Sequence, residues 1–154
     1  METEASQDAL SLARASHVGH DAAVRLLLAA NASPDAMDEE GRSALSLASG
    51  GGHTGVVCLL MEARANLEDM DDCGRTPMHL AARRGRVETA RALLAAGARL
   101  DAMDDEGLQP LAAACAGRQP RMARFLLEAQ AAPDAADNSG ATALSWASSQ
   151  GCAG

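Results

Sequence analysis

Four aspartates recur along this chain at intervals of 33 residues, and each is followed three residues later by a glycine. These Asp-x-x-Gly motifs lie at residues 38–41, 71–74, 104–107 and 137–140. Pairs of bulky apolar residues recur in the same register, at residues 27–28, 60–61, 93–94 and 126–127. A fixed period of this length is the signature of a repeat architecture, in which each unit packs on its neighbours. The chain is therefore expected to fold as one array of similar units.

The third unit indicates most clearly which structure each copy adopts. Residues 71–74 are typical of a turn, because glycine tolerates the positive φ that a tight turn requires. Thr76 has the hydroxyl of a helix N-cap, and Pro77 suits the first helical position, where an amide hydrogen is not needed. A second helix is expected over residues 87–95, and Gly97 is expected to end it in the left-handed conformation. Each unit is thus predicted to run turn, helix, loop, helix.

Residues 76–81 read Thr-Pro-Met-His-Leu-Ala, which resembles the Thr-Pro-Leu-His-x-Ala signature of the ankyrin repeat family. The resemblance extends over about residues 8–152 and implies an all-α repeat solenoid with a concave face that grips other proteins. It implies an ankyrin array of about four helix pairs plus a terminal half repeat, with hairpin fingers between repeats. In the family the signature histidine, here His79, braces the turn through hydrogen bonds. A single ankyrin repeat domain is accordingly expected over residues 1–154, divided at about residues 5–37, 38–70, 71–103, 104–136 and a partial 137–154.

The two ends of the array depart from the repeat pattern. Near the N-terminus, Asp8 occupies the position of the finger glycine, and Arg14 replaces the apolar residue of the other copies, as in a cap with a solvated face. At the other end, residues 142–149 are expected to form a first helix that no second helix covers. Trp146 is expected to pack against the helix that carries residues 125–127. A partner or a longer chain is expected to cover this end.

The glycine that ends the second helix of the third unit is replaced in the other units. Asn31, Arg64 and Gln130 stand at this position. A residue other than glycine in the left-handed conformation costs on the order of 1 kcal/mol. Residues 50–52, three consecutive glycines, weaken the first helix of the second unit as well. The second and fourth units are therefore expected to be the less stable ones.

Charge and composition exclude several classes of protein. The chain carries 21 acidic residues against 13 arginines and no lysine, for a net charge of -8, and its only aromatic residues are Phe125 and Trp146. A nucleic-acid groove needs positive charge and usually stacking rings, so nucleic-acid binding is not expected. No apolar run approaches the roughly 18–20 residues of a membrane helix, so direct membrane insertion is not expected either. The acidic start at residues 1–4 lacks the basic segment of a signal peptide and predicts a cytoplasmic protein, with a nuclear location or an organellar complex left open.

The chain shows no combination of nucleophile, base and orienting group that predicts an enzyme. Its histidines are His17, His20, His53 and His79, and its cysteines are Cys58, Cys73, Cys115 and Cys152. His20 and His53 share one repeat position, and a metal held between them is the alternative to a structural role. The cysteines lack metal-ligand spacing and are expected to be free thiols, with a disulfide pair as the alternative. No enzyme activity, cofactor, metal or small-molecule substrate is therefore predicted.

One repeat position on the fingers is a candidate for partner contact. It holds Met37, Met70 and Met103, which stacking would align in a row of pliable apolar side chains. The alternative is that each methionine packs on the neighbouring finger. Two further groups are expected on the same face: the residue after each finger glycine, and the end of the first helix in the third unit. The candidate partner-binding residues are therefore Met37, Arg42, Met70, Arg75, Arg83, Arg84, Met103 and Leu108. Ordinary helix-end charge is the alternative explanation for Arg83 and Arg84.

Most of the acidic residues lie in the predicted fingers and would form one negative ridge. They are Asp35, Asp38, Glu39, Glu40, Glu68, Asp69, Asp71, Asp72, Asp101, Asp104, Asp105, Glu106, Asp134 and Asp137. The simpler interpretation is that these acids close turns and keep exposed loops soluble, and the alternative is that the ridge steers a basic partner.

The function expected from the sequence follows from these observations. We expect a non-enzymatic protein-protein interaction module that binds its partner protein through the concave finger and first-helix face. That partner is expected to be a basic protein or part of a larger complex. The alternatives are a structural accessory subunit docked on a larger assembly and a stoichiometric inhibitor of an enzyme such as a kinase.

Overall fold

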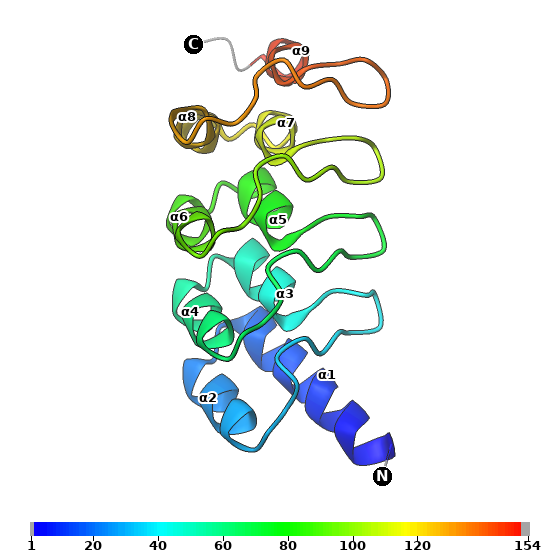
Figure 1. Cartoon of the computed structure of the whole chain (residues 1–154), viewed down its shortest axis with the longest axis vertical. Helices are drawn as coiled ribbons and strands as arrows, with labels where there is room; N and C mark the ends of the chain where they lie inside the picture. The colour runs from blue at the N-terminus through cyan, green and yellow to red at the C-terminus, as the bar shows by residue number, and fades with distance from the viewer. Residues whose placement is uncertain (1, 152–154) are drawn as a thin grey trace.

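The structure is a computed structural model, and it describes residues 2–151. Within that range the regular elements are helices, namely α1 (Glu2–Val18), α2 (Asp21–Ala29), α3 (Ala44–Gly51), α4 (Thr54–Glu62), α5 (Pro77–Arg83), α6 (Val87–Ala95), α7 (Pro110–Ala116), α8 (Pro120–Glu128) and α9 (Ala143–Ser149). Figure 1 shows the odd-numbered helices in one column, the even-numbered helices beside them, and the finger loops projecting on the opposite side. Isolated antiparallel bridges join Met37 to Ser43 and Ala136 to Thr142 at the bases of two fingers. The predicted all-α repeat array is confirmed.

Neighbouring repeats pack odd helix on odd helix and even helix on even helix. The odd helices carry small buried residues, among them Ala48, Ala81 and Ala114, and small side chains allow helix axes to approach closely. Larger side chains such as Leu60 and Leu93 are fully buried in the same core, and burial of each contributes about 1.5–3 kcal/mol. Helices of seven to nine residues are marginal alone in water, so each depends on this packing.

The helix boundaries predicted for the third unit are confirmed. Helix α5 begins at Pro77 after the N-cap Thr76, and α6 spans Val87–Ala95. Past its end, Gly97 has a φ of 98°. The local rules for N-caps, proline at the first helical position and left-handed glycine therefore place the start of α5 and the end of α6.

The predicted left-handed residues are also confirmed, with φ values of 65° at Asn31, 67° at Arg64 and 67° at Gln130. A fourth such residue, Arg118, has a φ of 56° and was not predicted. It stands 33 residues after Gly85, the left-handed glycine that follows α5. The 33-residue register could have predicted this conformation, because Arg118 aligns with a glycine that ends a helix in the left-handed region.

The N-terminal helix differs from its counterparts in length. Helix α1 has 17 residues, whereas α3 has eight and α5 has seven, and the 33-residue period did not predict this extension. It packs on α2 and α3. Arg14 is exposed, which agrees with the solvated cap face predicted from the sequence.

The support of the last helix differs from the prediction. Helix α9 packs on α7, so the expectation that Trp146 rests chiefly on the helix with residues 125–127 is wrong. The physical reason is the column arrangement, in which a first helix stacks on the first helix of the preceding repeat. Trp146 is half-buried, and its indole Nε1 donates a hydrogen bond of 2.8 Å to Asp137 Oδ2. Cys152 lies outside the described residues.

Acid is expected to release Trp146 from Asp137. Hydrogen bonds from Ser139 and Trp146 hold the pKa of Asp137 down to about 2 from its ordinary 3.8. The stabilisation from this carboxylate is therefore present above about pH 4 and is lost as the pH falls towards 2. The folded carboxylate takes up its proton around pH 2, so on acidification from about pH 4 to about pH 1 we expect tryptophan emission to change and quencher access to rise around pH 2, while Asp137→Asn removes this step. Emission that stays constant over this range would contradict the interaction.

Candidate functional site

The repeating aspartates shape the base of each finger. One carboxylate oxygen of Asp38, Asp71, Asp104 and Asp137 accepts hydrogen bonds from the backbone N–H groups two and four residues later, at 2.8–3.1 Å. This arrangement closes the turn on the glycine that follows each aspartate. The structural interpretation of these four acids is therefore confirmed.

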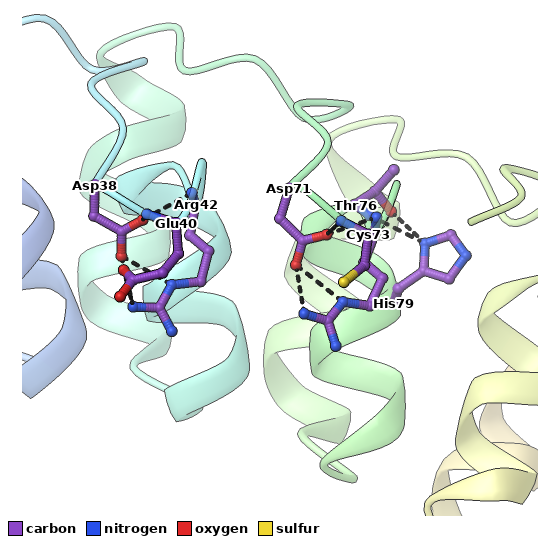
Figure 2. A network of polar contacts seen from close by, with 8 residues as sticks. Asp38, Glu40, Arg42, Asp71, Cys73, Thr76 and His79 are labelled. Carbon is purple, nitrogen blue, oxygen red and sulfur yellow. Dashed lines mark hydrogen bonds and ion pairs between the residues drawn. The ribbon is translucent and has the colours of Figure 1, made fainter. Parts of the chain in front are cut away.

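In two fingers the second carboxylate oxygen binds an arginine. Arg42 donates from Nε and Nη2 to Asp38 Oδ2 at 2.8 and 2.7 Å, and Arg75 does the same to Asp71 Oδ2 at 2.9 and 2.7 Å. Figure 2 shows the two clusters in successive repeats. Burial alone would raise the pKa of Asp71, but the hydrogen bonds and charge of Arg75 lower that pKa overall. Charge-assisted pairs of this kind fix both guanidinium groups on the finger base.

Other acids of the ridge join one repeat to the next. Asp35 accepts a hydrogen bond from the backbone N–H of Asn66 at 2.7 Å, and Glu68 accepts one from the N–H of Arg99 at 2.9 Å. These contacts order the loops between successive repeats. Part of the negative ridge therefore has a structural task, in addition to any effect on a partner.

His79 links the third finger to the fourth. Its Nδ1 lies 3.2 Å from the Thr76 backbone nitrogen and 2.8 Å from Thr76 Oγ1, and its Nε2 lies 2.8 Å from the carbonyl oxygen of Leu108. A carbonyl only accepts, so Nε2 must carry the proton and Nδ1 must accept from Thr76, which defines the neutral tautomer. Figure 2 shows the Thr76 and His79 side chains facing each other. The bracing role that the family resemblance implied for His79 is confirmed.

Leu108 does not belong to an exposed contact face. It was predicted to contact the partner with Arg42 and Arg75, but it is only 2% exposed and lies in the core. The three residues share one repeat position, yet an arginine reaches out to a neighbouring aspartate where a leucine turns inward. The prediction is wrong for Leu108 because repeat position alone does not decide burial.

The three methionines of the candidate site are exposed, as predicted. Met37 is 45% exposed, and Met70 and Met103 are each 52% exposed. Each precedes the aspartate that closes its finger, so the backbone beneath it is held by the hydrogen bonds described above. The three half-exposed methionines thus form a row of apolar surface above the hydrogen-bonded finger backbone.

A groove of about 500 Å³ runs beside these finger bases. The predicted residues Arg42, Arg75, Arg83 and Arg84 all line it, with His17 from the end of α1. Its remaining lining residues are Ser46, Leu47, Gly50, Leu80, Ala116 and Gly117, from α3, α5 and the end of α7. The structure thus brings together residues from four repeats, and the lining includes no aspartate or glutamate.

The other chemical candidates have local roles. His20 Nδ1 accepts a hydrogen bond from the N–H of Ala23, whereas His53 Nε2 bonds the carbonyl oxygen of His17. Among residues 2–151 no group of three His, Cys, Asp or Glu side chains is arranged to hold a metal ion. Cys73 is an exposed free thiol, and Cys58 is a half-buried one. No helix in the described range combines the length and apolar character needed to cross a membrane.

Comparison with family models identifies the class of protein. A model described as ankyrin repeats (3 copies) matches residues 12–104, and one described as ankyrin repeats (many copies) matches residues 82–127. A search of curated proteins gives no match to this chain. The first model spans more than half of the sequence, so the chain belongs to the ankyrin repeat family. Ankyrin repeats are generally protein-protein interaction modules, and the family is typically non-enzymatic.

The neutral state of His79 predicts a pH dependence of stability. Burial lowers the pKa of His79 below its ordinary 6.5, so the unfolded chain takes up this proton first. Stability from the neutral ring is present above about pH 6.5 and falls as the pH drops below it. Urea unfolding of the wild type and His79→Gln between pH 8 and 5 measures this. We expect the variant to lose about 1–3 kcal/mol at pH 8 and less at pH 5. An equal loss at both pH values would contradict the neutral brace.

Proposed function

We propose that this protein is a non-enzymatic interaction module whose partner binds the concave face formed by the finger bases and the first helices. The observation that carries the proposal is the row of half-exposed methionines, Met37, Met70 and Met103. Methionine side chains adapt to varied apolar surfaces, and here they stand on a hydrogen-bonded base. The hydrogen-bonded finger backbone beneath them is already ordered, so it loses little conformational entropy on binding.

The chemistry of the groove supports a binding role over catalysis. Its lining has no cysteine, lysine or carboxylate, and Ser46, the one hydroxyl residue in the lining, is 1% exposed. Attack on a substrate requires an accessible nucleophile with a base within hydrogen-bond distance. The arginines of the groove are suited to holding negative charge.

The exposed finger acids support a second feature of the proposed partner. Asp72, Asp105 and Glu106 are exposed and stand clear of the arginine pairs at Asp38 and Asp71. Like charges in a row attract a basic surface and raise its association rate. We therefore expect basic regions of the partner to lie opposite these three acids at the finger tips. The free thiols of Cys58 and Cys73 support a reducing compartment such as the cytoplasm.

An accessory subunit docked on a larger assembly is the second candidate. Leu144 in α9 is 73% exposed and Leu127 in α8 is 46% exposed. The two leucines form an exposed apolar surface on α8 and α9, the last helices of the described range, and a large assembly would cover that surface.

Site-specific photocrosslinking separates these proposals. A benzophenone amino acid replaces one residue at a time: Met70, Met103, Leu144 or, as an exposed control, Arg121 on α8. Each variant is mixed with an extract of the cells in which the protein naturally occurs, and the mixture is irradiated. We expect one shared protein adduct from Met70 and Met103, with no such adduct from Arg121, because only the finger positions face the partner. An adduct from Leu144 alone would favour the accessory role. Adducts from Arg121 alone, or none from any position, would contradict the proposed face.

A further inference from the structure

Arg83 and Arg84 differ from the other arginines of the groove because their charges are not neutralised. Arg42 and Arg75 bind Asp38 and Asp71. In the part of the chain that the structure describes, no carboxylate oxygen lies within 4 Å of the Arg83 or Arg84 guanidinium, and neither side chain donates a hydrogen bond. Both residues are exposed. The groove therefore holds two full positive charges available to a ligand.

The neighbours of these arginines are small. One repeat to either side, Gly50 and Ala116 occupy the position of Arg83, and glycines occupy the position of Arg84. A Cβ atom built on Gly50 would lie 3.5 Å from Arg84 Nη1, so the missing side chain leaves that nitrogen open. On the other side, a Cβ on Gly117 would collide with the carbonyl oxygen of Arg83, because the two helix ends are closely packed. Because the neighbouring repeats have glycine or alanine at these positions, no large side chain covers Arg83 or Arg84 from either side.

The charge of the groove is opposite to that of the whole chain. Arg83 and Arg84 bring two unpaired positive charges to a groove whose lining includes no acidic residue, although the net charge of the protein is -8. A helix dipole places about half a negative charge at the end of α5, and an arginine there compensates it. Compensation of the dipole therefore needs only about half of one positive charge, whereas Arg83 and Arg84 together supply two. Helix-end charge therefore does not explain the groove.

We propose that this groove binds an acidic segment of the partner protein, with carboxylates held by Arg83 and Arg84. This inference rests on the proposed interaction function and specifies the chemistry of the partner. Guanidinium groups bind carboxylates through paired hydrogen bonds. A segment of protein fits better than a nucleic acid, because the exposed acids Asp72, Asp105 and Glu106 at the finger tips repel an extended polyanion. The methionine row offers apolar contacts that a phosphate backbone does not use.

Peptide selection tests the proposal without knowledge of the partner. A random 16-residue display library is selected on the wild type, and dissociation constants of the enriched peptides are measured by calorimetry. We expect the enriched peptides to contain clusters of Asp and Glu. Arg83→Gln with Arg84→Gln should weaken their binding about tenfold or more, since paired hydrogen bonds to both groups are lost. Gly50→Glu should weaken it as well, because it places a carboxylate of the chain itself beside Arg84.

The matched control removes the same charge from another face. Arg121 and Arg124 are exposed on α8 and line no part of the groove. Arg121→Gln with Arg124→Gln should leave the affinity within about twofold of wild type, and circular dichroism verifies that all variants fold. Equal weakening by both double variants would show non-specific attraction and overturn the proposal. Enrichment of basic or uncharged peptides, or of none, would also overturn it.

Two further results separate this inference from the proposed function. A single-stranded oligonucleotide of 16 thymidines that binds tighter than the acidic peptides, and loses binding in the Arg83/Arg84 variant, would assign the groove to a nucleic acid instead. Crosslinking from Met70 and Met103 that persists in the Arg83/Arg84 variant with unchanged yield would refute the acidic segment and leave the interaction face intact. Crosslinking confined to Arg121 would refute both.

Discussion

Close packing of one first helix on the next is the constraint on which this structure depends. The helices have seven to nine residues after α1, too few to be stable alone, and their stability comes from burial between neighbours. Alanines such as Ala48, Ala81 and Ala114 are fully buried in this column. The same packing sets the finger bases side by side and brings the ends of α3, α5 and α7 together around one groove. The binding surface is thus a product of the stacking and not of any single repeat.

The repeats use the same positions for different purposes. The aspartate oxygen that binds Arg42 in one finger and Arg75 in the next accepts the indole N–H of Trp146 in the last described finger. The position that holds His79 in the third repeat holds Ser46 in the second, where the hydroxyl has no hydrogen-bond partner. The shared backbone frame of the repeats therefore tolerates these changes, and both unpaired arginines of the groove, Arg83 and Arg84, come from the third repeat.

Much of the fold was predictable because the 33-residue register and local rules act together. Pro77, Val87 and the left-handed Asn31 lie as these rules predict. The candidate site was predictable where a side chain depends on its own finger, as for Met70. It was not predictable where burial depends on other repeats, since Leu108 turns into the core. The sequence placed the four arginines of the groove in one candidate site, but it did not indicate that His17 and the small residues Gly50 and Gly117 from other repeats line the same surface.

Hydrogen–deuterium exchange of the full chain, with and without the crosslinked partner or an enriched peptide, tests the binding face most directly. We expect slower exchange on binding at the finger amides of residues 70–75 and at the C-terminal end of α5. Exchange in α2, α4, α6 and α8 should stay unchanged, because these helices form the opposite column. Slower exchange confined to the even-numbered helices would show that the partner binds the opposite column and not the finger bases.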